Sequence, residues 1–72
     1  MVTFREARSA VEGRYSSPTS SDGFEDSEDF NVMLQPPLSD EVVLVSKDSG
    51  EIHPEVYFEV QEKLEAMTPV RD

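Results

Sequence analysis

The sequence contains no cysteine and no tryptophan, and it has one histidine among its 72 residues. Without cysteine the chain can form neither a disulfide nor a thiolate zinc site, and one histidine cannot build a histidine metal site. A domain of this size buries little more than half of its unfolded surface and is marginally stable unless something staples it. We therefore expect no cofactor and no metal, and a core stabilised by close packing or by a partner chain.

Basic residues are also scarce. The chain has six Lys and Arg against sixteen Asp and Glu, which gives a formal net charge of −10. Phosphate backbones and anionic lipid surfaces attract positively charged proteins, so this balance disfavours direct binding to nucleic acid or membrane. It favours a protein partner with a basic surface, although solubility alone explains the charge equally well.

Long apolar runs are missing as well. No segment approaches the roughly 20 apolar residues that span a bilayer. The N-terminal segment MVTFREARSA lacks the apolar core of a signal peptide. We expect a soluble, cytoplasmic protein.

Residues 3 to 15, TFREARSAVEGRY, have the pattern of an amphipathic helix. Thr3 and Glu6 have the spacing of a capping box, in which each side chain bonds the other residue's free backbone N–H. The apolar stripe recurs on a 3.6-residue period and is formed by Phe4, Ala7, Val11 and Tyr15.

The middle of the chain predicts strands. Residues 16 to 23 lack periodicity and are expected to form a flexible connection. Phe30, Val32 and Leu34 alternate with Asn31, Met33 and Gln35, which is the period of a half-buried strand, and Pro36-Pro37 ends that pattern. Residues 41 to 47, EVVLVSK, are rich in β-branched side chains and predict a central strand. A hairpin turn in SKDSGEI then leads to a third strand at residues 51 to 53.

Residues 55 to 67, EVYFEVQEKLEAM, predict a second helix with Pro54 at its first position. The resulting order is helix, loop, three strands and helix. It predicts an α+β fold in which a three-stranded antiparallel sheet packs the N-terminal and the C-terminal helix on one face. We expect residues 1 to 72 to form a single small domain.

The stretch SSPTSSDGFEDSEDF, residues 16 to 30, concentrates carboxylates. Counted from Asp22, a calcium loop would need an oxygen ligand at its third position and a glycine at its sixth, and both are lacking. The acids could instead bind a partner protein, imitate phosphates in a basic cleft of a nucleic-acid enzyme, or simply solvate a loop and a strand edge. The residues concerned are Asp22, Glu25, Asp26, Glu28 and Asp29.

The sequence does not predict catalysis. His53 lies between Ile52 and Pro54, and a catalytic role would require a nucleophile and an orienting group to converge on it. The paired carboxylates would need a substrate groove to act as a glycosidase. We expect no enzyme activity, and we expect His53 to satisfy a free N–H or to face water.

Tyr57 and Phe58 are adjacent on the predicted second helix, so their side chains point about 100° apart. One of them could be exposed to a partner, because aromatic residues are favoured at the centres of interfaces. The alternative is a helix buried over a wide face. Met33 raises the same question on the outer face of the sheet.

Four segments occur together: VTFREAR, GFEDSEDFNV, VLVSKDSGEI and EAMTPV. In this order they resemble the immunity protein 35-like (YrhB-type) group of small proteins from actinobacteria and their phages. Members of that group have a helix opened by a TFEEA-like box and a strand ending in a D-K-x-T-G-E-like hairpin. This chain is shorter between the first helix and the first strand, and it lacks tryptophan. The resemblance implies a small interaction protein without catalysis, in some cases an antitoxin-like inhibitor, in a bacterial cell or a phage-infected host.

Our leading hypothesis is a small acidic protein that binds another protein and modulates or inhibits it. Its contact surface would combine the acidic residues 22 to 29 with Met33, Tyr57 or Phe58. The alternatives are a self-assembling subunit, such as a homodimer, and a phosphate or DNA mimic.

Overall fold

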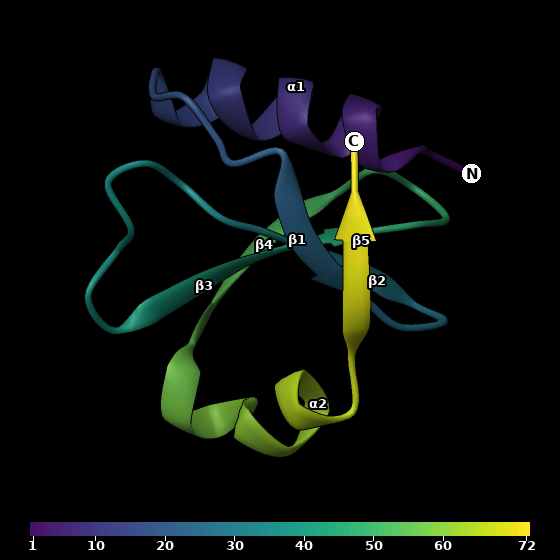
Figure 1. The fold of residues 1–72 in the computed structure, drawn as a ribbon, viewed down its shortest axis with the longest axis vertical. Helices are drawn as coiled ribbons and strands as arrows, with labels where there is room; N and C mark the ends of the chain where they lie inside the picture. The colour runs from purple at the N-terminus through teal and green to yellow at the C-terminus, as the bar shows by residue number, and fades with distance from the viewer.

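The computed structural model describes all 72 residues. Five strands form one antiparallel sheet in the order β4-β3-β2-β1-β5, with helix α1 on one side of the sheet and the short helix α2 on the other (Figure 1). No helix is both long and apolar enough to span a membrane. The elements are α1 (Phe4–Tyr15), β1 (Asp22–Glu25), β2 (Asp29–Val32), β3 (Glu41–Ser46), β4 (Ile52–Val56), the 3-10 helix η1 (Tyr57–Glu59), α2 (Gln61–Glu65) and β5 (Thr68–Arg71).

The prediction of a three-stranded sheet with both helices on one face is wrong. Two further strands, β1 and β5, pair with each other in antiparallel register from Asp22 opposite Arg71 to Glu25 opposite Thr68. Each is only four residues long and polar or proline-containing, so neither has the apolar alternation that predicts a strand. The two helices lie on opposite sides of the sheet (Figure 1).

The structure confirms the first predicted helix, which is α1. The Thr3 side chain accepts a hydrogen bond from the Glu6 N–H at 3.1 Å, and the Thr3 N–H donates to the Glu6 carboxylate at 2.8 Å. These are the reciprocal bonds of a capping box. The helix ends at Ser16, whose φ of 54° places it in the left-handed region.

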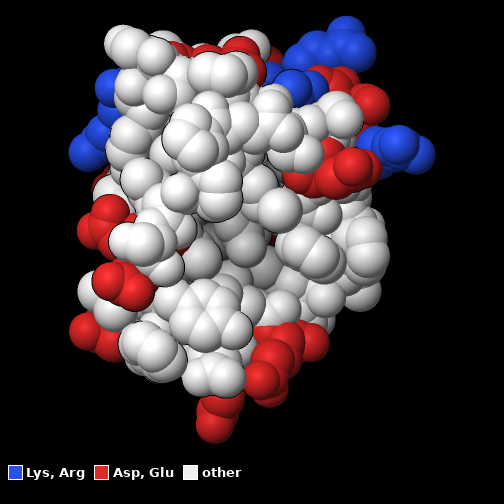
Figure 2. All heavy atoms as spheres, turned by 60° about the vertical axis from the view of Figure 1, so that its left-hand side comes forward, with Lys and Arg blue, Asp and Glu red and all other residues white.

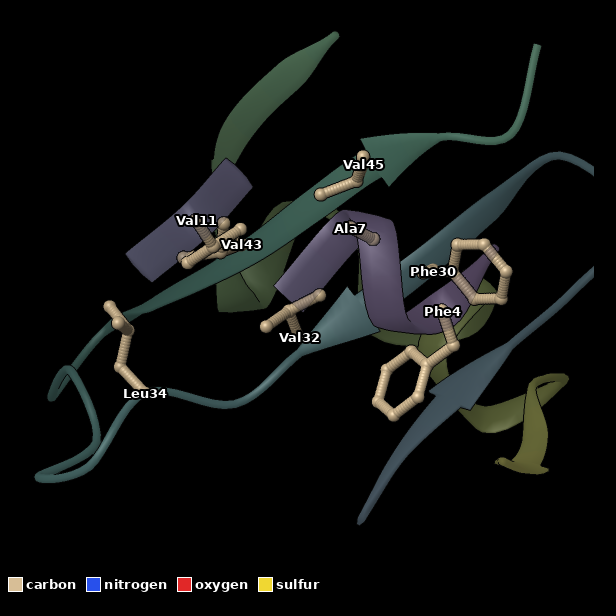
Figure 3. Packing of buried hydrophobic residues seen from close by; sticks show 8 residues of the cluster. All are labelled: Phe4, Ala7, Val11, Phe30, Val32, Leu34, Val43 and Val45. Atoms are coloured by element: carbon tan, nitrogen blue, oxygen red, sulfur yellow. The ribbon is translucent and has the colours of Figure 1, made fainter. Parts of the chain in front are cut away.

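The hydrophobic core lies between α1 and the central strands. Figure 3 shows the apolar side of the helix facing side chains from β2 and β3. The Phe4 and Phe30 rings are 5.6 Å apart between centroids, and the side chain of Val45 is fully buried. Each such buried apolar side chain contributes about 1.5–3 kcal/mol relative to an exposed one. The core residues are Phe4, Ala7, Val11, Phe30, Val32, Leu34, Val43 and Val45.

The second helix predicted at residues 55 to 67 is shorter and broken: residues 55 and 56 belong to a strand, and the 3-10 helix η1 precedes the five-residue α2. Residues 52 to 56 form the edge strand β4, which pairs with β3 from Ile52 opposite Val45 to Val56 opposite Glu41. Pro54 therefore lies within a strand and not at a helix start. The hairpin turn is as the sequence predicts, with Gly50 at a φ of 77°. Once the chain turns there, pairing with the aliphatic strand β3 outweighs the helical periodicity of these residues.

Each edge strand of the sheet contains a proline at a position whose backbone groups face away from the neighbouring strand. The Ser46 N–H donates to the Glu51 carbonyl at 2.9 Å, and the Tyr57 N–H donates to the Asp40 carbonyl at 2.8 Å. Because hydrogen-bonded and non-hydrogen-bonded pairs alternate, Pro54 falls at a position whose backbone groups face outward.

The same geometry recurs on β5. The Asp72 N–H donates to the Ser21 carbonyl at 2.9 Å, so the register directs the backbone of Pro69 outward. Proline has no N–H to offer, so a strand added to either edge would lack a hydrogen bond at that point.

The connection predicted at residues 16 to 23 makes several contacts. Thr19 is buried and forms an isolated β-bridge with Leu34. The Glu12 carboxylate accepts hydrogen bonds from the Thr19 N–H at 3.0 Å and from its hydroxyl at 2.9 Å. These two bonds lower the pKa of the Glu12 carboxyl. Arg8 also donates to the Thr19 hydroxyl at 3.0 Å, which joins this connection to α1.

Candidate functional site

The acidic residues singled out in the sequence are paired with cations of the same chain. Asp22 on β1 lies 3.1 Å from the Arg71 guanidinium on β5, and both side chains are exposed. Glu25 accepts a hydrogen bond from the Lys47 ammonium at 2.8 Å. Lys47 also lies 4.8 Å from the centroid of the Phe30 ring. These pairings cancel part of the negative charge that the sequence places here.

The remaining three acids surround one lysine of α2. The Lys63 ammonium lies 2.8 Å from Asp26, 3.0 Å from Asp29 and 3.2 Å from Glu28. We call these four residues the Lys63 cluster. The five-residue α2 has no fully buried residue of its own. The Lys63 cluster is therefore a principal attachment of α2 to the sheet.

The Lys63 cluster shifts the ionisation of its members. Partial burial by itself would lower the pKa of the Lys63 ammonium, but hydrogen bonds to Asp26, Asp29 and Glu28 outweigh burial and raise it. Burial likewise opposes ionisation of Asp26. The bond from Lys63 and the backbone N–H groups of Asp29 and Glu28 outweigh this effect, so the pKa of Asp26 is lowered.

The same three carboxylates have the spacing of a metal site. Oxygens of Asp26, Glu28 and Asp29 lie within 4.8 Å of one another. The Lys63 ammonium occupies the position between them, so a divalent cation would have to displace a hydrogen-bonded positive charge. The cluster supports a structural tether for α2.

His53 lies on β4, and both of its ring nitrogens face carboxylates. Its Nε2 is 2.9 Å from Asp29 and its Nδ1 is 3.5 Å from Glu55. A histidine acting as general base needs a free nitrogen facing a nucleophile. Here neither nitrogen faces a serine hydroxyl, so the arrangement links β2 to β4 and does not form a triad.

An apolar groove lies on the face of the sheet opposite α1. It has a volume of about 490 Å³, within the range of ligand and peptide sites. Strand residues form its floor, and one wall comes from the loop after β2 while the other comes from η1 and α2. Figure 2 shows the hollow bounded by uncharged atoms. The apolar side chains lining it include Phe24, Met33, Leu38, Val42, Tyr57 and Leu64.

Several of these side chains are too exposed for a closed core. Phe24, Met33, Leu38 and Tyr57 each keep 36–41% of their surface accessible. Leu44, which also faces this side of the sheet, is 1% exposed. Exposed apolar residues that gather in one concave patch are a mark of a binding surface.

The acids near the groove differ from those of residues 22 to 29. The ion pairs within the chain leave Asp40, Glu41, Glu59, Glu62 and Glu65 without a basic partner. Glu41 lines the groove, and the last three belong to η1 and α2, which form its wall. Figure 2 shows acidic side chains below the hollow, to its left and at its upper right, where basic side chains also lie. We call these five residues the acidic rim.

The structure thus divides the residues predicted to bind a partner. Met33 and Tyr57 line the groove. Phe58 does not line it, but is 74% exposed and packs edge-on against Tyr57 with 5.7 Å between ring centroids. Phe24, Leu38, Val42 and Leu64 were missed, because their place in the groove depends on β1 and on the position of α2. An isolated phenylalanine within an acidic stretch was the one signal in the sequence for Phe24.

No protein-family model, no curated protein and no solved structure matches this chain.

Proposed function

We propose that this chain is a non-enzymatic binding protein that takes a segment of a basic partner protein into the apolar groove. The observation that carries this proposal is the groove itself, in which exposed apolar side chains gather together with Glu41. The other acids of the acidic rim lie next to Glu41 in sequence or belong to η1 and α2. An interface with an apolar centre and charged surroundings has the usual anatomy of protein recognition.

The charge of the chain supports a basic partner. Five of the cations (Arg5, Arg8, Lys47, Lys63 and Arg71) already have acidic partners within the chain. The acidic rim has none, so the field beside the groove is negative. Such a field steers a positively charged partner toward the groove and raises the rate of association at low salt. The absence of cysteine is consistent with this chain meeting its partner in a reducing cytoplasm.

The edges of the sheet support the groove over strand addition as the binding mode. A partner that extended the sheet would meet the outward-facing Pro54 on one edge and Pro69 on the other. Neither can donate to a new ladder. The groove presents no such obstacle, because its contacts come from side chains.

Inhibition of the partner, as the resemblance to the immunity proteins implies, remains a proposal. Occupying a functional segment of the partner would be sufficient for it. Phosphate mimicry by residues 22 to 29 has less support, since Asp22, Glu25 and the acids of the Lys63 cluster are paired within the chain.

Self-assembly is the second candidate, and the exposed Phe58 favours it. Two copies facing each other through this surface would also bring their acidic rims together, and the like charges would repel. Sedimentation of wild type and of Phe58→Ser distinguishes self-assembly from binding of a foreign partner. A monomer in both proteins supports a foreign partner, whereas a dimer lost in Phe58→Ser supports self-assembly.

The proposal is tested with two substitutions that change charge equally. Met33→Lys places a cation in the groove, while Val56→Lys places one at a site of similar exposure outside it, 41% against 39%. The probe is a short peptide of leucine and lysine, compared with its counterpart in which glutamate replaces lysine. We expect the basic peptide alone to bind, and Met33→Lys alone to abolish binding, by calorimetry at low salt. Equal loss in both variants, or equal binding of both peptides, would overturn the proposal.

A further inference from the structure

One polar side chain lies in the apolar floor of the groove. Asn31 is in the middle of β2, opposite Phe24 on β1 and Leu44 on β3. Its neighbours Phe30 and Val32 point into the core beneath α1. Because side chains alternate along a strand, Asn31 points to the other face, where the groove is.

The Asn31 amide is free to bond with an occupant. It makes no side-chain hydrogen bond within the chain, and no buried side-chain nitrogen or oxygen lacks a partner. Its polar atoms are therefore accessible, and Asn31 as a whole is only partly buried. Accessible polar atoms of this kind bond solvent water until a ligand covers them.

When an occupant fills the groove, the Asn31 amide determines which kind of occupant binds well. An apolar occupant would displace the water and leave a donor and an acceptor buried without partners, which opposes binding. An occupant that offers both an acceptor and a donor avoids this loss. A backbone peptide group in an extended chain offers both, whereas in an α-helix the same groups are bonded internally.

We propose that the groove selects an extended segment of its partner, in which one backbone peptide group bonds the Asn31 amide. This inference rests on the proposed function and deepens it. In an extended segment, alternate side chains point to opposite sides. Apolar side chains on one side would contact Phe24 and Met33, and basic side chains on the other would remain near the acidic rim.

The test uses two leucine–lysine peptides of identical composition and length. One alternates leucine and lysine, which is the period of a strand, and the other places leucine at helical spacing. Both are titrated, as monomers by sedimentation, into the full-length protein at low salt. We expect the alternating peptide to bind about tenfold more tightly, which corresponds to one well-placed hydrogen bond.

Asn31→Leu is the decisive variant, and Gln61→Leu makes the same chemical change on α2, outside the groove. We expect Asn31→Leu to reduce the tenfold preference to about one and Gln61→Leu to keep it. Asn31→Val serves as a second variant suited to a strand, with folding checked by thermal denaturation.

Four results would count against the inference. A preference that persists in Asn31→Leu overturns it. So does a helical-spacing peptide that binds wild type equally well and loses binding in Met33→Lys, although that result keeps the proposed function. If neither peptide binds in a manner sensitive to Met33→Lys, the proposed function fails together with the inference. Binding of dodecanoate but of neither peptide would identify the groove as a small-molecule site and overturn both.

Discussion

The two faces of the sheet are built on different principles. On the face beneath α1, apolar side chains such as Val11 and Val45 are fully buried, and close packing holds the layers together (Figure 3). On the opposite face, α2 is held largely by the charged Lys63 cluster, and apolar side chains such as Met33 remain partly exposed. The first arrangement is typical of a core and the second of a binding surface.

This difference shows how a chain of 72 residues can fold around one core and still leave apolar side chains accessible on the other face of the sheet. So short a chain can bury one core at most, and here one helix and two strands supply nearly all of it. The second face does not need to be closed for stability. It can therefore keep exposed apolar residues, which a larger and better-covered domain would bury.

The largest effect is expected from a substitution that breaks the core on the α1 face. Phe4→Ala removes a ring that packs 5.6 Å from Phe30, and we expect a loss of about 3–5 kcal/mol. This approaches the total stability of a small domain, so much of the protein would be unfolded at room temperature. Phe24→Ala, on the groove face, should cost about 1 kcal/mol or less. Urea denaturation of both variants checks the contrast, and equal losses would contradict it.

Two glycines give the next contrast. A Cβ at Gly23 would lie 2.7 Å from the Phe4 ring and 2.7 Å from the Asn31 carbonyl oxygen, so β1 and α1 would have to separate. We expect Gly23→Ala to destabilise by about 1–3 kcal/mol. A Cβ at Gly13 has nothing within 4 Å, so Gly13→Ala should stabilise α1 by about 0.5–1 kcal/mol. Thermal denaturation of both variants measures the change in Tm, and changes of the same sign in the two variants would contradict this prediction.

The sequence predicted the parts of the fold that rest on local patterns. The capping box of Thr3 and the apolar stripe of α1 depend on residues three or four apart. The hairpin turn and the aliphatic strand β3 are also local, and the structure confirms them.

The errors concern elements whose structure is set by distant partners. Strand β5 contains Pro69 and exists because β1 pairs with it. The helical pattern of residues 55 and 56 gave way to pairing with β3. Lys63 brings α2 to acids more than thirty residues away in sequence, and this contact helps to place one wall of the groove. A pattern within a short window cannot report such contacts.

The tether of α2 gives a smaller contrast on the groove face. Lys63→Met leaves Asp26, Glu28 and Asp29 close together without a counter-charge, and we expect a loss of about 1–2 kcal/mol. Arg71→Met breaks an ion pair whose side chains are 78% and 64% exposed, so it should cost less than about 0.5 kcal/mol. Chemical denaturation measures both. A larger loss in Arg71→Met than in Lys63→Met would show that α2 is held by something other than this lysine.

The smallest expected effect is the pH dependence of that tether. The pKa of Asp26 in the folded chain lies below its ordinary value of 3.8, because the bond from Lys63 and two backbone N–H groups outweigh the opposing effect of burial. Asp26 therefore contributes stability above that pH, and the contribution is lost as the pH falls through the folded pKa. The Lys63 pKa is raised above 10.5, so its contribution is present below that value and is lost as the pH rises through the folded pKa.

The difference in unfolding free energy between wild type and Lys63→Met should consequently be constant from about pH 5 to about pH 9 and narrow outside that window. The narrowing at about pH 3 should remain below about 1 kcal/mol, since the cluster is partly exposed to solvent. Urea denaturation of both proteins across this range measures it, and taking the difference removes the titration of the acidic rim, which both proteins share. A difference that stayed constant to about pH 3 would mean that α2 is attached by apolar contacts of Leu64 and Met67, and that the second face resembles the first more than the charged cluster indicates.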